Sequence, residues 1–432
     1  MTSTALLTDH YELTMLQASL ASGHAHRKCV FESFARGLPG GRRYGVLAGT
    51  GRVLEALKDF RFGDDELSFL SRTKVVNGET LDYLANYRFS GNISGYAEGE
   101  CYFPGSPLMV VESTFAEGVI LETLVLSILN YDSAVATAAS RMTATADGRP
   151  CLEMGSRRTN EQSAVAAARA AYIAGFEATS NLEAGRSHGV PTVGTAAHSF
   201  TLLHDTEEEA FASQIASLGA NTALLVDTYD VTNAVKIAVD LAGSELGGVR
   251  LDSGDLVSQA REVRAQLDSL GAKDTRIVVT SDLDEYAIAG LQAAPVDAYG
   301  VGTRVVTGSG SPAAGMVFKL VSRESQSGEM EGVAKASKNK ASVGGRKYAL
   351  RRRNAVGVAQ EELIGIQREP QDDGDDRLLL TELVRDGEVV AATDAQSARA
   401  HHQKSRAELP TRALRLSAGD PAIPTTYLDD WS

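Results

Sequence analysis

The sequence predicts an α/β protein made of an irregular, incomplete α/β barrel and a split α+β domain built from the N- and C-terminal parts. From about residue 191 onward, short apolar runs alternate with helical segments, which is the pattern of a parallel sheet with crossover helices. Polar residues follow each apolar run instead of gathering at one point, which favours an incomplete barrel over an open sheet. The 432 residues are enough for two domains, each with its own core.

The N-terminal region mixes helical and strand-like segments and is expected to form an α+β domain with antiparallel character. Its expected elements are a helix over Glu12–Leu20 and strands over Cys29–Ala35, Tyr96–Cys101 and Leu108–Glu112. Composition changes near Val119, and two long helices rich in Ala and Leu are expected over Val119–Met142 and Asn160–Ala178.

The alternating region predicts six strands and four intervening helices. The strands are Pro191–Thr195, Thr222–Asp227, Val249–Asp252, Arg276–Ser281, Ala298–Thr303 and Val317–Val321. The helices, between the first five strands, are Thr206–Leu218, Val231–Ala242, Leu256–Leu270 and Leu283–Gln292. Residues after about Ser322 are expected to fold back on the N-terminal region. The predicted domains are therefore 1–118, completed by about 340–432, and a catalytic barrel over 119–339.

Charge and composition exclude several classes of protein. A formal net charge of -14 argues against nucleic-acid or anionic-membrane partners, so the basic run at residues 335–353 is interpreted as a solvated face. The three cysteines, Cys29, Cys101 and Cys151, form no CxxC pair, which predicts a reduced protein without a cysteine metal site. The start has no signal-peptide pattern, and the most apolar run is broken by Glu122. A cytoplasmic location is expected.

The segment Gly248–Leu256, GVRLDSGDL, predicts a strand, a tight turn and the start of a helix. Two carboxylates and a hydroxyl, from Asp252, Ser253 and Asp255 around Gly254, suit a polyol such as ribose, directly or through Mg²⁺. A simple helix N-cap is the alternative interpretation. Several other predicted strands end in the same way, and this favours a site.

Two further motifs indicate phosphate binding. Gly302, Thr303 and Arg304 close a predicted strand, and Val305 stands where a dinucleotide fingerprint requires glycine. Arg157 and Arg158 directly precede a predicted helix N-terminus, where cations are unfavourable unless an anion binds there. No GxxxxGK[ST] motif occurs, so any use of ATP must take another route.

His198 follows a predicted strand among small residues, in GTAAHSF, and Asp227 closes the next strand. A carboxylate one strand away could fix the imidazole tautomer and raise its nucleophilicity. Asp282, in TSDLDE, could cap the next helix or complete a ribose or metal site, and we weigh the two equally. The loops that bear Arg157, His198, Asp252 and Gly302 are expected to converge on one cavity.

With these motifs together, the chain resembles the nicotinate phosphoribosyltransferase family. The resemblance includes LLTDHYELTM, FARGLPGGRRYGVLAGTGR, GSRRT, GTAAHSF, VRLDSGDL, TSDLDE and YGVGTRVVT, and it weakens beyond about Leu350. It implies an irregular barrel beside a domain made of both chain ends. It also implies that nicotinate and phosphoribosyl pyrophosphate give nicotinate mononucleotide and pyrophosphate in NAD salvage, with ATP as co-substrate and Mg²⁺.

The resemblance also implies roles for individual residues. It implies a phosphohistidine at His198, oriented by Asp227, and pyridine contact by Tyr11 across a homodimer interface. Asp252, Ser253 and Gly254 are implied to bind the phosphoribosyl group, and Gly302 and Thr303 its 5′-phosphate. Arg157 and Arg304 are implied to bind the pyridine carboxylate or the phosphates. The neighbouring residues of these motifs that we also expect to bind substrate are Arg158, Ser199, Arg250, Asp255 and Asp282. The metal ligands are not assigned.

The choice between acid and amide depends on GFEATSN, where relatives that take nicotinamide carry an aspartate. Ser180 can donate to a carboxylate and brings no repelling charge, so nicotinate is favoured. Met154 stands where the nicotinamide enzymes place an aromatic residue that stacks on the ring.

Three alternatives to this reading remain. The first is a nicotinamide or quinolinate phosphoribosyltransferase, and the second is a sugar-phosphate barrel isomerase or aldolase, for which only Lys319 is a Schiff-base candidate. The third is a non-enzymatic, phosphate-responsive regulator.

Overall fold

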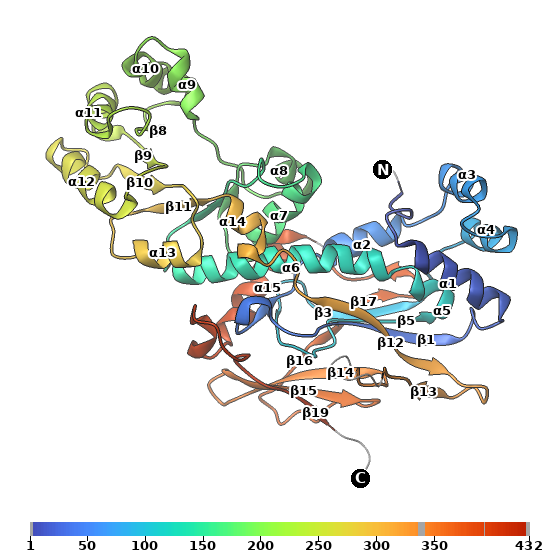
Figure 1. The fold of residues 1–432 in the computed structure, drawn as a ribbon. Coiled ribbons are helices and arrows are strands. Elements are labelled where there is room, and N and C mark those ends of the chain that lie inside the picture. The colour runs from blue at the N-terminus through green and yellow to red at the C-terminus, as the bar shows by residue number, and fades with distance from the viewer. Residues whose placement is uncertain (1–2, 336–341, 393, 429–432) are drawn as a thin grey trace. The chain divides into compact units, whose positions relative to one another are not determined.

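A computed structural model describes residues 3–335, 342–392 and 394–428. The chain divides into two compact units, residues 1–137 with 311–432 and residues 138–310 (Figure 1). The division falls within the long helix α6 (Glu122–Thr145). The domain bounds expected from the sequence stay a prediction, and residues 336–341 of the basic run lie outside the described residues.

The first unit is built around a seven-stranded antiparallel sheet with the order β13-β12-β1-β5-β3-β17-β18. The strand bounds are β1 Lys28–Ala35, β3 Asn92–Tyr96, β5 Met109–Thr114, β12 Met316–Glu324, β13 Met330–Gly332, β17 Leu380–Arg385 and β18 Glu388–Val389. Phe31 of β1 pairs with Leu320 and Val111, and its ring stacks on Phe318 with centroids 5.2 Å apart. N- and C-terminal strands therefore share one sheet.

Two smaller sheets, six further α-helices and the first part of α6 complete the described part of this unit. The four-stranded sheet has the order β16-β14-β15-β19, with bounds Arg377–Leu378, Lys347–Arg353, Ala359–Ile366 and Thr425–Leu428. The two-stranded sheet pairs β2 (Gly45–Val46) with β4 (Cys101–Tyr102). The helices are α1 His10–Ala21, α2 Thr50–Lys58, α3 Asp64–Thr73, α4 Gly78–Ala85, α5 Phe115–Val119 and α15 Ala395–Ala407.

The second unit contains a six-stranded, wholly parallel sheet with the order β7-β6-β11-β10-β9-β8. The bounds are β6 Cys151–Glu153, β7 Ala178–Thr179, β8 Ala223–Leu225, β9 Gly248–Leu251, β10 Arg276–Val279 and β11 Ala298–Val301. The helices of this unit are α7 Glu161–Ile173, α8 Leu182–His188, α9 His198–Leu203, α10 Glu207–Leu218, α11 Val231–Ala242, α12 Leu256–Ser269, α13 Glu285–Leu291 and α14 Thr303–Val306.

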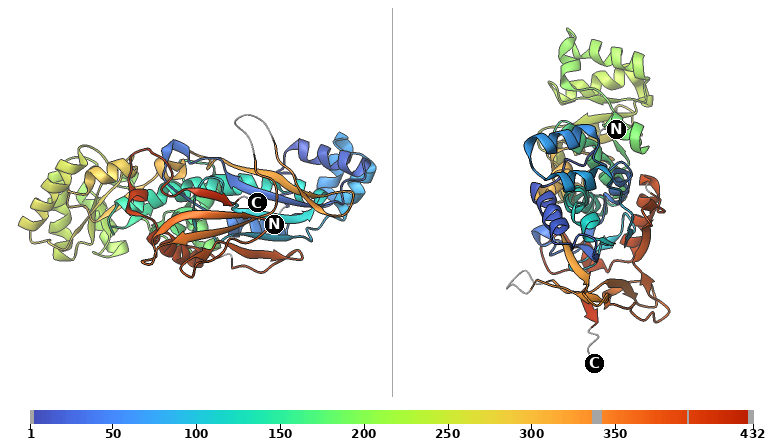
Figure 2. Two further views of the ribbon diagram at one scale, coloured as in Figure 1. Left: turned by 90° about the horizontal axis from the view of Figure 1, so that it is seen from below. Right: turned by 90° about the vertical axis from the view of Figure 1, so that its right-hand side faces the viewer.

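This parallel sheet is an incomplete barrel. Helices α10, α11 and α12 pack in succession along one side of the strands (Figures 1 and 2). The edge strands β7 and β8 have no strand between them, and one isolated parallel bridge, Thr179 to Thr192, continues the sheet beyond β7. The predicted fold class, with a curled parallel sheet and further sheets from both chain ends, is confirmed.

In the region expected to form the barrel, one predicted strand was wrong, one is a strand of the other unit's sheet, and strands β6 and β7 were missed. In the N-terminal region, the strand expected over Tyr96–Cys101 is instead the turn between β3 and β4. Pro191–Thr195 forms only the bridge at Thr192, because Pro191 has no N–H to donate and Gly194 disfavours extended pairing. Val317–Val321 lies in β12 and pairs antiparallel with β1, not with the barrel strands. Strands β6 and β7 span three and two residues, which is too short to produce a periodic pattern.

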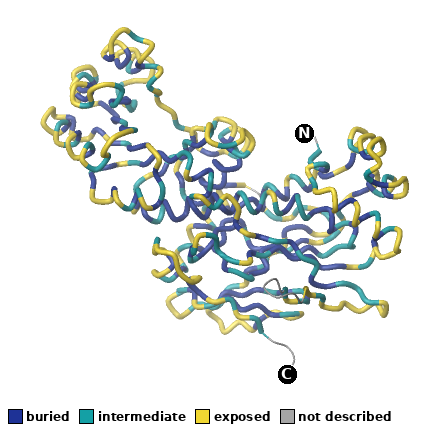
Figure 3. Tube along the Cα trace, in the orientation of Figure 1, coloured by how far each residue is buried: buried dark blue, intermediate teal, exposed yellow. Residues whose placement is uncertain are grey.

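Burial explains why the short strands hold their places (Figure 3). Val249, Leu251, Ile277, Val279 and Tyr299 are fully buried and alternate along three adjacent strands. Strands with one buried side chain at every second position have a defined register, because a slip of one residue would expose the whole set.

One helical stretch, residues 115–145, is long and apolar enough to cross a membrane by length and composition alone. Sixty-one per cent of its most apolar window is buried inside the protein. A helix that is apolar on most sides and buried within a folded chain is the usual core helix of a large domain.

Candidate active site

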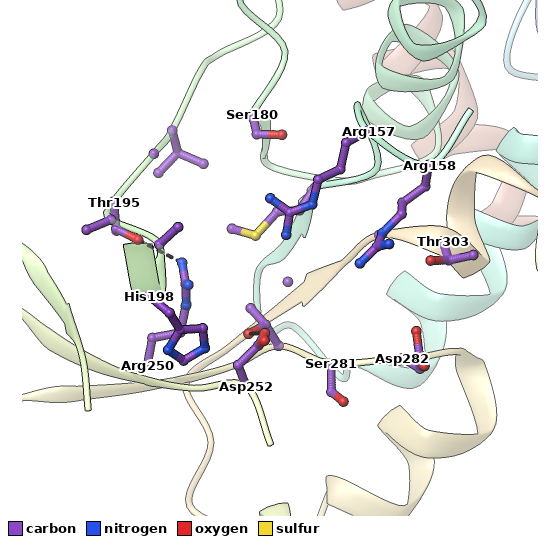
Figure 4. Close-up of a pocket in the computed structure, with 18 residues that line it drawn as sticks. Arg157, Arg158, Ser180, Thr195, His198, Arg250, Asp252, Ser281, Asp282 and Thr303 are labelled. Atoms are coloured by element: carbon purple, nitrogen blue, oxygen red, sulfur yellow. Dashed lines mark hydrogen bonds between the residues drawn. The ribbon is translucent and has the colours of Figure 1, made fainter. Parts of the chain in front are cut away.

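The strand ends of the parallel sheet surround a cavity of about 440 Å³ within the second unit (Figure 4). Its walls come from the segments after β6, β7, β9, β10 and β11 and from the approach to α9. Arg157, His198, Asp252 and Gly302, whose loops were expected to converge, all line it. The carboxyl end of a parallel sheet is where α/β barrels place their active sites.

The loops after β6 and β11 approach each other closely because both carry glycine. A Cβ on Gly155 would lie 2.2 Å from Val306 Cγ1 and 3.0 Å from the carbonyl oxygen of Gly302. A side chain at residue 155 would therefore push the Arg157 loop away from the Gly302 loop. Arg157 and Arg158 extend into the cavity from this side (Figure 4).

Glu153, which was not among the expected site residues, fastens the loop that bears the arginines. Its buried carboxylate accepts hydrogen bonds from the Gly155 N–H and the Thr179 hydroxyl, and its carbonyl accepts the Ser180 N–H at 2.8 Å. Burial raises the pKa of Glu153, while the bonds from Thr179 and Gly155 oppose the rise. The sequence signal that could have identified Glu153 is its position as an acid at the end of the short strand β6.

His198, Asp227 and Asp252 are connected across adjacent strand ends. Asp227 Oδ2 accepts hydrogen bonds from the Asp252 N–H and the Ser253 hydroxyl, both at 2.8 Å. Asp227 Oδ1 lies 3.9 Å from His198 Nε2, and Thr228 Oγ1 lies 3.2 Å from His198 Nδ1. The Asp227 side chain is 2% exposed and the His198 side chain 40%, so a buried acid stands behind an accessible imidazole.

Arg250 enters the cavity from the opposite side. Its Nη1 donates to the Thr195 hydroxyl at 2.9 Å, and its buried Nε has no hydrogen-bond partner among the described residues (Figure 4). Burial lowers the pKa of Arg250 and the charge of Arg157 lowers it further, whereas Asp252 and Asp227 raise it. Two arginines that repel each other across a cavity are suited to hold an anion between them.

The turns after β9 and β10 each carry two acids, one that caps the following helix and one that lines the cavity. Asp255 caps α12 by accepting the N–H groups of Val257 and Ser258, and Asp284 caps α13 in the same way. Asp252 accepts a hydrogen bond from the Thr280 hydroxyl and lines the cavity, as does Asp282. Each turn therefore satisfies its helix with one acid and presents another to the cavity.

Comparison with known proteins gives a consistent result. A model of the nicotinate phosphoribosyltransferase (NAPRTase) N-terminal domain matches residues 6–130. The chain is 55% identical to nicotinate phosphoribosyltransferase pncB1 of Mycobacterium tuberculosis, over 97% of this chain and 94% of that protein. It is 36% identical to nicotinate phosphoribosyltransferase of Bacillus subtilis, over 81% and 73% of the two chains. The chain belongs to the nicotinate phosphoribosyltransferase family.

Solved structures agree with this family. The crystal structure of human nicotinic acid phosphoribosyltransferase matches 97% of both chains with a TM-score of 0.83 and 25% identity. The resemblance inferred from the motifs and the expectation that the chain is an enzyme are therefore confirmed.

The cavity of this nicotinate phosphoribosyltransferase family member gathers most of the residues proposed from the sequence. Those that line it are Arg157, Arg158, Ser180, His198, Arg250, Asp252, Asp282, Gly302 and Thr303. Those that do not line it are Ser199, Asp227, Ser253, Gly254, Asp255 and Arg304. Asp227 acts on the lining through its hydrogen bonds, whereas Ser199 and Arg304 are exposed beside lining residues.

Tyr11 belongs to the first unit and is 44% exposed. Burial of its ring and the neighbouring Glu122 raise the pKa of Tyr11 to about 12, so its hydroxyl stays protonated and able to donate. Sequence reasoning did not select Thr195 and Thr280, which hold Arg250 and Asp252. The roles of these two hydroxyls depend on which strands lie side by side in the sheet, and only the folded structure shows this.

Proposed function

We propose that the chain joins nicotinate to the ribosyl carbon of phosphoribosyl pyrophosphate and releases nicotinate mononucleotide and pyrophosphate, as a step of NAD salvage. The observation that carries this proposal is the convergence of Arg157, His198, Asp252 and Gly302 on one cavity in a member of this family. Three buried, unpaired cysteines support a reducing compartment, and we infer a cytoplasmic location.

The phosphates are proposed to bind between the arginines and the Gly302 loop. Arg157 and Arg250 stand on opposite sides of the cavity, and an anion placed between them would relieve their repulsion. At the end of β11, Gly302 lets a phosphate approach the backbone closely, and Thr303 adds a hydroxyl. The same positive charge would stabilise the pyrophosphate leaving group as its negative charge develops.

The carboxylates of Asp252 and Asp282 are proposed to bind the ribose hydroxyls and to hold Mg²⁺. Both acids line the cavity, and carboxylate oxygens are the hard ligands that Mg²⁺ requires, so the residues present fit this ion. When bound, Mg²⁺ supplies charge neutralisation for the pyrophosphate oxygens. Asp227 positions Asp252 by accepting its N–H.

The pyridine is proposed to bind near Ser180, whose hydroxyl can donate to the nicotinate carboxylate. The lone pair of the ring nitrogen forms the bond to the ribosyl carbon. The carbon–oxygen bond to pyrophosphate breaks and leaves its electron pair on the departing oxygen. No protein base is needed because the pyridine nitrogen carries no proton to remove, so orientation of the ring is the main task of the site.

ATP is proposed to act through His198. Transfer of the terminal phosphoryl group to the imidazole would form a phosphohistidine and ADP, which explains the use of ATP without a P-loop. Asp227 Oδ1, 3.9 Å from Nε2, would stabilise positive charge on the ring. The imidazole is accessible from the cavity, so the two reactions share one pocket.

We also infer a homodimer in which Tyr11 of the partner subunit contacts the pyridine ring. Tyr11 exposes 44% of its surface in one chain, and Leu202 and Leu203 of α9, close to His198, expose 62% and 77%. Exposed apolar side chains next to a polar cavity favour burial against a second copy.

The decisive experiment is an assay of purified protein with phosphoribosyl pyrophosphate, Mg²⁺ and each pyridine in turn, with and without ATP. Nicotinate should be the fastest substrate, and ATP should stimulate its reaction. If nicotinamide or quinolinate reacts faster than nicotinate, the substrate assignment fails. The aldolase alternative required Lys319 as the Schiff-base lysine at a barrel strand end. Lys319 lies instead in β12 of the antiparallel sheet, 3.5 Å from Glu122.

A further inference from the structure

A second cavity, of about 610 Å³, lies within the first unit, where the C-terminal residues 410–425 cover the loop of residues 41–43. The Gly419 N–H donates to the Gly41 carbonyl at 2.9 Å, and the Ala422 N–H donates to the Arg43 carbonyl at 2.7 Å. The two backbone segments are therefore fastened together, and the cavity between them has fixed walls.

Arg43 lines this cavity and forms no ion pair among the described residues, although Asp420 also lines the cavity. A Cβ on Gly419 would lie 2.4 Å from Arg43 Nη2, so the guanidinium packs directly on the glycine backbone. Arg43 Nε is buried and has no hydrogen-bond partner within the described part of the chain. Buried polar groups are almost always paired, so an unpaired guanidinium nitrogen at a cavity indicates a missing acceptor.

Two more groups in the cavity have unused hydrogen-bonding capacity. Arg412 donates from Nε to the Ala422 carbonyl at 2.7 Å, and its terminal nitrogens have no partner among the described residues. Thr425 Oγ1 is buried and, among the described residues, also lacks a partner. Two arginines and one acid, Asp420, line the cavity, so it carries a net positive charge in a chain that has 56 acidic against 42 basic side chains.

The remaining wall suits a flat ring. Pro104, Pro421 and Pro424 line the cavity beside the arginines. Proline rings present rigid apolar faces that cost little conformational entropy when they pack against a ligand. A ligand with a phosphate at one end and a planar apolar group at the other would satisfy both parts of the cavity.

We propose that this cavity binds a nucleotide, with its phosphate held by Arg43 and Arg412 and its base packed on the prolines. The cavity shares no lining residue with the candidate active site, so the nucleotide would occupy a separate site. The proposal does not depend on the proposed reaction.

The test uses adenosine 5′-monophosphate as the probe and calorimetric titration of the full-length protein. The double variant Arg43→Gln/Arg412→Gln should weaken binding of this probe roughly tenfold or more, because two charge-assisted hydrogen bonds are lost. Adenosine should bind more weakly than the nucleotide, and inorganic phosphate should bind but lack the contribution of the ring.

Arg415→Gln is the matched control, because Arg415 is exposed on the same segment and does not line the cavity. Its affinity for the probe should equal that of the unchanged protein. Binding that is unaffected by the double variant but lost in Arg157→Gln would place the probe in the candidate active site and overturn the proposal. Absence of probe binding at millimolar concentration would overturn it equally.

Discussion

His198 Nε2 lies 3.9 Å from Oδ1 of Asp227, and that buried carboxylate oxygen has no hydrogen-bond partner among the residues that the structure describes. The other oxygen of the same carboxylate accepts the Asp252 N–H at 2.8 Å. One buried acid therefore contacts both the proposed phosphohistidine and the proposed ribose ligand. The two halves of the proposed reaction, ATP use and ribosyl transfer, are connected through Asp227.

Asp227→Asn should reduce ATP stimulation on the order of 10²-fold, because a neutral amide no longer stabilises positive charge on the imidazole. Its amide oxygen can still accept the Asp252 N–H, so the fold should be retained. The measurement is the initial rate with and without ATP, together with phosphohistidine formation from labelled ATP. Asp230→Asn is the control, because Asp230 caps α11 and is exposed. An unchanged ATP response in Asp227→Asn would contradict the proposed role.

Arg157→Gln should raise KM for phosphoribosyl pyrophosphate by roughly tenfold to a hundredfold, because a hydrogen bond to a charged group contributes about 1.5–3 kcal/mol. Steady-state rates at varied concentrations of each substrate would separate KM from kcat. Arg186→Gln is the control, because Arg186 is exposed on α8 and pairs with Glu183 of the same helix. A KM that is equal in the variant and in the unchanged protein would remove Arg157 from the phosphate site.

Gly155→Ala should destabilise the protein by about 1–3 kcal/mol, because the new Cβ would lie 2.2 Å from Val306 Cγ1. Activity should fall as well, since the arginine loop would move away from the Gly302 loop. Denaturant unfolding and the assay together test both effects. Gly290→Ala, in α13 with no atom within 4 Å of its Cβ position, should be neutral or slightly stabilising. Equal stability of the two variants would refute the close-packing argument.

Arg351→Met should destabilise the protein by about 3–5 kcal/mol, because it removes the cation that pairs with buried Glu362, whereas Glu100 keeps its ion pair with Arg377. Arg351 is fully buried and connects strands from both ends of the chain. Arg385→Met, which breaks an exposed pair with Glu382, is the control and should cause no measurable change. Urea unfolding of both variants gives the comparison, and a small effect of Arg351→Met would mean that the cluster contributes little.

His402 should make the protein less stable in mild acid. Burial lowers the pKa of His402 to about 4, with a further contribution from Arg406, whereas an unfolded histidine titrates near 6.5. Between these values the unfolded chain binds a proton that the folded chain does not, so the free energy of unfolding falls as pH decreases from about 6.5 to about 4. The loss amounts to at most about 3 kcal/mol.

The measurement for His402 is urea unfolding at pH 7.5 and pH 5 for the unchanged protein and for His402→Gln. Other buried acids titrate in the same range, so the relevant quantity is the difference between the two proteins. The variant should lose less stability on acidification. Identical pH dependence would show that His402 is not the group responsible.

Local sequence motifs predicted those elements of the site whose structure depends only on residues adjacent in the chain. The strand, turn and helix around Asp252 and Asp255 follow from residues within one short segment, and α11 was predicted with its observed bounds, Val231–Ala242. Strands β6 and β7 were not recognised, because segments of three and two residues carry no period. Their place in the sheet depends on pairing with β11, far away in the sequence.

The sequence by itself determined the fold class and the family, and it supplied the site residues that we propose, because each depends on the order and spacing of residues along the chain. Only the tertiary structure decided which of them meet. The distance from His198 to Asp227, the hydrogen bond from Arg250 to Thr195 and the packing of Arg43 on Gly419 all arise from segments that are distant in the chain. Contacts of this kind depend on burial and strand pairing, which no local pattern of residues encodes.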